Sequence, residues 1–245
     1  MSHQGYFRLL QFYSDVWTRA HCRVIIDGEK HLAEGGAPHR VYIVSHPTTY
    51  DLPVLAHLSK RNFYVVVAEG PFAHPIVGWL FRKTGFPMLK SDNSEEVIQE
   101  SIRLMHGGAP LIYSLKGYGV DFGEDVRPRT GGIRIAHRAE ADIYPVHLMI
   151  EEGRMIFKYY RDRKGGVYPY TIFWNTLYFA TFCEPIRFSD YAKQGMGYED
   201  YRQIAFHIND LFNRTQAGLE RDLEENSARY RRMRRWGGAP RRLPL

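Results

Sequence analysis

A histidine and an aspartate five residues apart form the first pair in this sequence whose chemistry can be named. His46 and Asp51 lie in the segment SHPTTYD, which follows HRVYIV, an apolar run typical of a buried strand. Imidazole accepts a proton near neutral pH, and a carboxylate bonded to its other ring nitrogen fixes the tautomer and stabilises the imidazolium that forms. The pair therefore predicts a general base and its orienting carboxylate, acting on a hydroxyl or an amine.

The position of a proline decides whether these two side chains can meet. Pro53 has no N–H and is tolerated only in the first turn of a helix, so we expect no helix before Thr49 or Tyr50. His46 then lies on the loop at the carboxyl end of the strand, and Asp51 lies in the first helical turn. A loop histidine can fold back onto such a carboxylate. In an open α/β sheet this edge is also where ligands bind.

A second pair with the same spacing, His137 and Asp142, has the opposite context. His137 comes late in a predicted helix, Gly131 to Ala139, that leads into a strand. Asp142 then lies at the other end of the sheet, where residues are usually structural. We predict a structural role for His137.

The elements that must position the first pair alternate along the chain. Strand-like runs occur at HRVYIVS, NFYVVVAEG, LIYSL and IYPVHLMI, and SEEVIQESIRLMHGG has the end signals of a helix from Ser94 to Gly107. This alternation predicts an α/β fold with a mixed, largely parallel sheet flanked by helices. We expect MIFKYYRD, which follows the EEGR turn, to form a hairpin with IYPVHLMI.

We predict a single domain over residues 1–245, because a 44% hydrophobic content suffices for one core and no linker or repeat divides the chain. An amphipathic helix is expected within residues 1–22, and the core that carries the motifs spans 40–150. A helical region at 198–236 and a basic tail at 237–245 complete it. We expect its buried side to be formed by four residues: Ile204, Ile208, Leu211 and Phe212.

Two apolar segments leave their surroundings open. In the N-terminal helix six side chains recur at helical spacing: Tyr6, Leu9, Leu10, Tyr13, Val16 and Trp17. We expect this stripe to pack on the protein's own core, with binding at a membrane interface as the alternative. The aromatic stretch from Tyr168 to Phe182 is expected to be buried strand, with an acyl tunnel or a membrane interface as alternatives.

Charge and cysteine content indicate partners and compartment. Lys and Arg exceed Asp and Glu by 33 to 27, and the stretch from Arg229 to Arg242 contains arginines but no acid. We expect an anionic partner there, either a membrane or an acidic acyl carrier protein, and no nucleic acid, because no nucleic-acid-binding signature accompanies the arginines. The alternative is a solvated tail that binds nothing. Two cysteines and no bilayer-spanning stretch predict a cytoplasmic protein, at most peripheral on the inner face of the cytoplasmic membrane.

Three segments occur in an order that is more specific than the His and Asp alone: SHPTTYD, AEGPFAHPIVGWLFRKTGFPML and RTGGIRIAHRAEADIYPVHL. Together they resemble the blocks of the glycerolipid acyltransferases of the lysophosphatidic acid acyltransferase type, with Thr48 where many members of that family have serine. The resemblance spans about residues 40–148. It implies a glycerol-3-phosphate acyltransferase-like fold, with His46 as general base and Asp51 as its partner. It also implies an acyl thioester of coenzyme A or acyl carrier protein as donor, and no cofactor.

The segment after LIYSL departs from the family's pattern. The family has Phe-Pro-Glu-Gly-Thr-Arg there, and its Glu and Arg help to hold a phosphate-bearing acceptor. This chain reads YSLKGYGVDFGEDVRPRTGG, in which Gly117 aligns with the family's glycine but Lys116 replaces the glutamate. The departure affects recognition of the acceptor more than the chemistry, and it favours a specialised lipid or a secondary metabolite as acceptor.

Candidate groups for binding the substrate lie mostly around this segment. We predict contacts from Thr48, Lys90, Lys116, Gly117, Arg127, Arg129 and Gly131. Arginines suit the bidentate recognition of phosphate, and Gly131 opens a helix whose N–H groups can bind an anion. Lys90 lies close to where the family carries an arginine. Three acids of the loop would instead receive an amine or a polyol: Asp121, Glu124 and Asp125. The alternative is that these charged side chains face solvent and bind nothing.

Two other functions compete with acyl transfer. A thioester hydrolase would use water as the acceptor, and a noncatalytic protein of the same fold would bind a lipid or a carrier without turnover. The intact His46 and Asp51 argue against the noncatalytic protein. The sequence contains no GxSxG segment, which favours direct attack by the acceptor over a covalent acyl-enzyme. We therefore predict an acyltransferase of lipid metabolism that moves a fatty acyl group to a hydroxyl or an amine.

Overall fold

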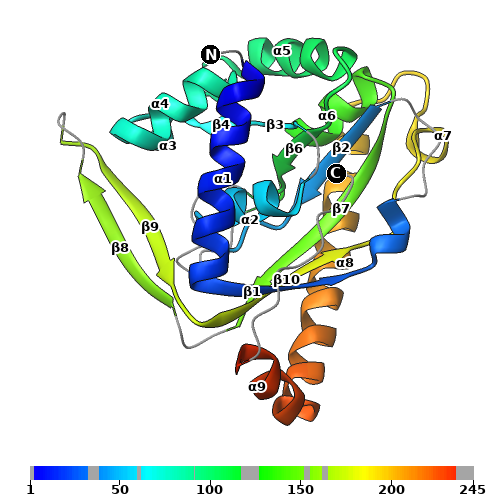
Figure 1. Cartoon of the computed structure of the whole chain (residues 1–245). Coiled ribbons are helices and arrows are strands. Elements are labelled where there is room, and N and C mark those ends of the chain that lie inside the picture. The colour runs from blue at the N-terminus through cyan, green and yellow to red at the C-terminus, as the bar shows by residue number, and fades with distance from the viewer. Residues whose placement is uncertain are drawn as a thin grey trace.

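A six-stranded sheet forms the centre of the computed structural model, which describes residues 3–32, 39–59, 62–90, 92–116, 127–151, 155–161 and 165–235. Its strands are β1 (Cys22–Asp27), β2 (His39–Val44), β3 (Tyr64–Val65), β6 (Leu111–Ser114), β7 (Ala141–Ile150) and β10 (Thr176–Phe182). The order across the sheet is β1-β10-β7-β2-β6-β3 (Figure 1). Strands β7, β2, β6 and β3 are parallel, whereas β10 runs antiparallel to β7 and carries β1 parallel to itself. The predicted α/β fold with a mixed, largely parallel sheet is confirmed.

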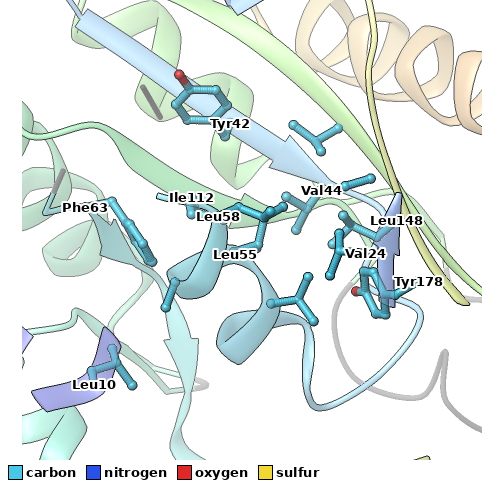
Figure 2. Close-up of a cluster of buried hydrophobic side chains, with 14 of the residues drawn as sticks. Leu10, Val24, Tyr42, Val44, Leu55, Leu58, Phe63, Ile112, Leu148 and Tyr178 are labelled. Atoms are coloured by element: carbon cyan, nitrogen blue, oxygen red, sulfur yellow. The ribbon is translucent and has the colours of Figure 1, made fainter. Parts of the chain in front are cut away.

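Helices cover both faces of this sheet because the central strands are buried on both sides. In β2, Tyr42 and Val44 point into one hydrophobic cluster, and Val41 and Ile43 point into another. The first cluster is covered by α1 (His3–His21), α2 (Asp51–Leu58), α3 (Glu69–Phe72) and α4 (Pro75–Thr84). The second is covered by α5 (Ser94–His106), α6 (Gly131–Arg138) and α8 (Tyr198–Glu225). Figure 2 shows side chains of α1, α2 and the sheet converging in the first cluster.

Short elements complete the chain. A 3-10 turn, η1 (Glu29–Leu32), follows β1, and α7 (Phe188–Tyr191) precedes α8. The C-terminal region that the sequence predicts to be helical is α8 followed by α9 (Ser227–Arg235). Two of its four predicted core residues, Ile208 and Phe212, are fully buried, whereas Ile204 and Leu211 are only partly so. The basic tail at 237–245 lies outside the described residues. Within the described ranges no helix combines the length and apolarity required to span a bilayer.

The predicted hairpin between MIFKYYRD and IYPVHLMI is wrong. The first segment, β8 (Met155–Arg161), pairs antiparallel with β9 (Val167–Phe173) in a separate two-stranded ribbon. The reason is that both edges of β7 are already taken, by β2 on one side and by β10 on the other. The stretch 168–182 is therefore divided: β9 belongs to the ribbon and β10 to the main sheet.

The run NFYVVVAEG is also divided, where the sequence predicts one strand. Its first part is β3, which pairs with β6, and its second part is β4 (Val67–Ala68), which pairs with β5 (Met88–Leu89) in a small parallel sheet. The backbone N–H of Val66 still bonds to β6, at Ile112, whereas that of Val67 bonds to Pro87 next to β5. The chain therefore changes partner between two consecutive residues.

Candidate active site

His46 and Asp51 meet at the carboxyl end of β2, as their spacing predicts. The imidazole Nδ1 lies 2.7 Å from Asp51 Oδ2. The imidazole side chain is 29% exposed and the carboxylate 3%. Because an ionised carboxylate can only accept hydrogen bonds, Nδ1 carries the proton, and Nε2 of a neutral ring is then the basic nitrogen. The carboxylate is buried and the imidazole remains open to a substrate.

The backbone of His46 is turned into an uncommon conformation that returns its ring to Asp51. Its φ angle is 57°, in the left-handed region, which costs a residue with a Cβ about 1–2 kcal/mol. Ser45 anchors the chain immediately before this turn. Its Oγ donates to Leu148 O at 3.1 Å and accepts from Leu148 N at 2.8 Å, and its N–H donates to Val146 O at 3.2 Å. These bonds to β7 fix the point from which the His46 loop starts.

Asp51 is held by four donors among the described residues. Its Oδ2 accepts from His46 Nδ1 and from the Thr48 N–H at 3.3 Å, and its Oδ1 accepts from Thr48 Oγ1 at 2.8 Å and from the Tyr178 hydroxyl. A carboxylate offers about four lone-pair positions, so these donors fill it. They compensate the burial of the charge. They also fix the plane of the carboxylate, and with it the direction of the bond to His46.

Two of the residues that hold Asp51 differ in whether the sequence predicted them: Thr48 is a predicted site residue and Tyr178 is not. Thr48 is fully buried, and its hydroxyl accepts the Tyr50 N–H at 3.2 Å while it donates to Asp51. Tyr178 lies 127 residues after Asp51, on β10, with no exposed surface; Figure 2 shows it within the first hydrophobic cluster. Sequence reasoning missed Tyr178 because nothing local marks it. The one available signal is that a buried tyrosine hydroxyl needs a partner.

Aromatic rings of α1 and β9 pack on Tyr50, in the loop between His46 and Asp51. Trp17 of α1 stacks on Tyr50 with ring centroids 4.6 Å apart, and Phe173 of β9 meets Trp17 edge-on at 5.0 Å. The Thr171 N–H donates to Thr49 Oγ1 at 2.9 Å, which ties β9 to the same loop. Burial, with Tyr13 and Tyr170 nearby, raises the pKa of Tyr50 to about 12, so its hydroxyl stays neutral.

Backbone hydrogen bonds bring part of the candidate binding segment to the His46 edge of the sheet. The Leu115 N–H donates to Val44 O at 2.9 Å, and the Arg129 N–H donates to Leu115 O at 2.7 Å. The chain on both sides of residues 117–126 is therefore adjacent to the end of β2. Lys116 lies half-buried at this edge, and the side chains of Arg127 and Arg129 are exposed beside it.

Gly131 begins α6, as predicted, and is packed against a tyrosine. A Cβ at this position would lie 2.2 Å from the Tyr113 hydroxyl oxygen. The glycine therefore allows the helix to start directly over β6. Burial raises the pKa of Tyr113, while the nearby guanidinium groups of Arg129 and Arg134 act in the opposite direction.

The other predicted site residues either fall outside the described residues or have no hydrogen bond that joins them to the His46 loop. Gly117 and the three acids of the loop, Asp121, Glu124 and Asp125, fall outside the described residues. Lys90 is exposed directly after β5, where its backbone N–H donates to Asn93 Oδ1 at 2.7 Å. Among the described residues, no hydrogen bond links Lys90 to His46.

His137 has the structural place that its context predicts. Its Nδ1 is 3.0 Å from the Tyr201 hydroxyl, between α6 and α8. Asp142 accepts the Phe188 N–H at 2.8 Å, at the start of α7. A pocket of about 400 Å³ lies between the end of β7, α8 and α9, and neither His46 nor Asp51 lines it. Within the described ranges, no group of three or more His, Cys, Asp or Glu side chains is arranged to hold a metal ion.

Comparison with known proteins adds a family and a fold. A family model described as "Acyltransferase" matches residues 23–149, which is more than half of the chain and includes His46 and Asp51. Among solved structures, the 1-acyl-sn-glycerophosphate (LPA) acyltransferase PlsC from Thermotoga maritima is similar, with a TM-score of 0.61 and 15% sequence identity. The similarity covers 87% of this chain and 79% of that chain. At this identity it establishes the fold alone. No sequence among the curated proteins matches.

Proposed function

This chain belongs to the acyltransferase family, and from that premise we propose that it moves a fatty acyl group from an acyl thioester to a hydroxyl or an amine, with His46 as general base. The family membership confirms the resemblance seen in the sequence. The observation that carries the assignment of His46 is the 2.7 Å bond between its Nδ1 and a carboxylate that is buried while the imidazole is not. That arrangement presents Nε2 as a base to an arriving acceptor.

The proposed reaction is direct attack. His46 Nε2 takes the proton of the acceptor hydroxyl or amine as the acceptor's oxygen or nitrogen attacks the thioester carbonyl carbon. The new C–O or C–N bond forms, the C–S bond breaks, and the imidazolium returns its proton to the departing thiolate. The products are the acylated acceptor and a free thiol. General base catalysis of this kind contributes about 10²–10⁴-fold to the rate.

Asp51, Thr48 and Tyr178 are proposed as positioning residues. Asp51 holds the His46 ring and stabilises the imidazolium that forms during attack. Thr48 was predicted to bind substrate, but its hydroxyl is directed at Asp51 and its side chain is buried, which supports a positioning role instead. Tyr178 holds the other side of the same carboxylate.

We propose the basic edge beside His46 as the binding region for the charged part of a substrate. Lys116, Arg127 and Arg129 carry cations there, and Gly117 and the α6 start at Gly131 complete the predicted segment. Phosphate groups occur both in coenzyme A and in phospholipid acceptors, so either substrate would find partners. Lys90 remains a proposed contact on the weaker ground of the resemblance. The replaced family segment supports a specialised lipid or secondary metabolite as acceptor.

The proposed setting is the cytoplasm, with peripheral contact on the inner face of the membrane. Cys22 and Cys183 are both free thiols, which suits a reducing compartment. An acyl carrier protein is a second proposed donor, because acidic carriers suit the basic edge and the C-terminal arginines. No nucleic acid is proposed as a partner.

The test is a transfer assay with purified protein, acyl-CoA and a panel of alcohols, amines and lysophospholipids. His46→Ala is expected to lower kcat/KM by about 10²–10⁴-fold. His137→Ala is the matched control, because that histidine also bonds a side chain but lies between α6 and α8. Full activity in His46→Ala would refute its role.

The same assay separates the alternatives. Consumption of acyl-CoA that does not depend on any added acceptor would indicate a thioester hydrolase. Saturable binding of an acyl chain without turnover across the panel would indicate a noncatalytic binding protein of this fold.

A further inference from the structure

Helix α1 places its most apolar face on the outside. Leu9, Phe12, Tyr13 and Val16 are 39%, 67%, 48% and 56% exposed, and their spacing puts them on one face of the helix. Towards the protein, α1 buries Ser14 and Thr18 completely, together with Phe7 and Leu10. The expectation that the apolar stripe packs on the protein's own core is therefore wrong for Leu9, Tyr13 and Val16. A helix in water normally shows the reverse arrangement.

Polar bonds fasten this unusual helix to α2. Asp15 Oδ1 lies 2.7 Å from Nδ1 of the buried His57, and Gln11 Nε2 donates to Ser59 O at 2.9 Å. Asp15 is the single acid in the α1 sequence, and it is engaged on the inner side. The charged residues on the exposed side of α1 are Arg8, just before Leu9, and Arg19, three residues after Val16. These polar contacts and the buried Phe7 and Leu10 together fix the orientation of α1, with Leu9, Phe12, Tyr13 and Val16 directed outward.

Neighbouring elements extend this face. On α4, Ile76 and Trp79 are 71% and 41% exposed, and the Trp79 ring meets Tyr6 of α1 edge-on at 5.5 Å. On β8, Phe157 and Tyr159 are 41% and 65% exposed. The ribbon contacts α1 through Phe173 and Trp17, and it contacts the residue before α4 through Tyr160 and His74 at 5.1 Å.

The arrangement of these three elements is visible in the fold. Figure 1 shows the ribbon extending from the sheet on the same side of the molecule as α1, α3 and α4. The sequences of α4, β8 and β9 contain Arg82, Lys83, Lys158 and Arg161 but no Asp or Glu. The combined face is apolar and aromatic with a cationic margin.

The ribbon indicates what kind of partner covers this face. Successive residues of a strand point to opposite sides, so Ile156, which is 42% exposed, and Phe157 expose apolar surface on both faces of β8. An isolated two-stranded ribbon is marginally stable in water. A protein partner would cover one face, whereas immersion in a lipid interface covers both. Exposed aromatic side chains with Lys and Arg at the margin also match the interface of an anionic membrane.

We propose that the outer face of α1, the exposed side of α4 and the β8–β9 ribbon together form a docking surface for an anionic lipid bilayer. Six residues define it: Phe12, Val16, Ile76, Trp79, Phe157 and Tyr159. The apolar side chains enter the boundary between headgroups and acyl chains, and the flanking cations meet the headgroups.

The docking surface adjoins the loop that carries His46. Trp17 of α1 stacks on Tyr50, and β9 bonds to Thr49 through the Thr171 N–H. Docking would therefore hold the His46 edge near the bilayer, where an amphipathic acceptor resides. This consequence rests on the proposed function, whereas docking itself does not.

The test is sedimentation of the full chain with vesicles of phosphatidylcholine alone and of phosphatidylcholine with phosphatidylglycerol. We expect stronger binding to the anionic vesicles, weakened by salt. The double variants Phe12→Ser/Val16→Ser and Phe157→Ser/Tyr159→Ser should each lower the partition coefficient at least about 10-fold. Phe206→Ser is the matched control, because that phenylalanine is 44% exposed on α8. It should bind like the unmodified protein.

Several outcomes would overturn the docking surface. Binding unchanged in both double variants, or lowered equally by Phe206→Ser, would contradict it. Ultracentrifugation without vesicles that shows a dimer dissociating in the double variants would assign the face to a second copy of the chain. Melting temperatures of all variants should match the parent, since the changed side chains are largely exposed. His46→Ala should bind vesicles fully, so loss of transfer and loss of docking are separable.

Discussion

Two histidine–aspartate pairs in this protein have the same bond length and opposite exposure. His46 and His57 each place Nδ1 2.7 Å from a carboxylate oxygen. In the first pair the imidazole is 29% exposed and the Asp51 side chain 3%, whereas in the second the imidazole is 2% exposed and the Asp15 side chain 18%. The Nε2 of His57 is buried with no hydrogen-bond partner among the described residues. A short bond to a carboxylate therefore does not make a base; access to the other ring nitrogen does.

The largest expected effect comes from the same substitution in both pairs. His46→Gln should lower kcat/KM by about 10²–10⁴-fold, and it should also lower stability because the buried Asp51 loses one of its four donors. His57→Gln should leave kcat within a few fold and cost about 1–3 kcal/mol in the free energy of unfolding, because the buried His57 ring and its bond to Asp15 are lost. Transfer assays and urea unfolding of the two variants measure both quantities. Equal losses of activity would show that exposure does not separate the pairs.

Removal of one donor to Asp51 should have the next largest effect. Tyr178→Phe deletes a hydrogen bond to a charged group, worth about 1.5–3 kcal/mol, and should lower kcat about 10–100-fold. KM should stay nearly constant, because Tyr178 has no exposed surface with which to contact a substrate.

Tyr191→Phe is the matched control for Tyr178→Phe. Tyr191 is also buried, and its hydroxyl donates to the backbone oxygen of Ala141 at 2.7 Å. This control should lose about 1 kcal/mol of stability and no activity. If both variants lose stability but keep full activity, Tyr178 has only a structural role. The functional difference between the two His–Asp pairs would then depend on His46 itself.

A structural feature could be predicted from the sequence where it depends on a few neighbouring residues, and not where it depends on contacts between distant segments. Pro53 limits where α2 can begin, so the meeting of His46 and Asp51 was predictable from a few residues. Tyr178 was not predictable, because its place beside Asp51 depends on β10 pairing with β7, a long-range choice. The ribbon was missed for the same reason: the partner of β8 depends on which strands had already occupied β7.

The orientation of α1 could not be predicted from the sequence for a different reason. An apolar stripe predicts a buried face only when the surroundings are water. The inner face of α1 instead combines the buried Phe7 and Leu10 with single polar contacts, such as Asp15 with His57 and Gln11 with Ser59. Partners of this kind leave no periodic signal, so periodicity identified the helix but not the direction of its faces.

A third histidine extends the comparison to a ring without any carboxylate. His147 of β7 is 3% exposed, packs against Phe212, and has no partner for either ring nitrogen among the described residues. Burial lowers its pKa from 6.5 to about 4, so it is neutral in the folded protein. The unfolded chain takes up this proton as the pH falls through 6.5, which favours unfolding until the folded state also protonates near pH 4.

The resulting loss of stability should be measurable by urea unfolding. Between pH 8 and pH 5, His147 should account for about 2 kcal/mol of lost stability. The variant His147→Leu should show a correspondingly shallower decrease than the unmodified protein, with other groups common to both. Parallel curves for the two proteins would mean that His147 is not held neutral.

The smallest expected effect concerns the bond between the ribbon and the His46 loop. Thr49→Val removes the acceptor of the Thr171 N–H while it nearly keeps the shape of the side chain, and it should cost about 1 kcal/mol. Because this bond ties β9 to the loop rather than to Asp51, amide hydrogen exchange at Thr171 should rise while the activity falls only a few fold. Unchanged exchange at Thr171 would place the attachment of the ribbon in its aromatic contacts, Trp17 with Phe173, instead of in this hydrogen bond. The loop around His46 would then be coupled to the ribbon through these rings, because Trp17 and Phe173 both contact Tyr50.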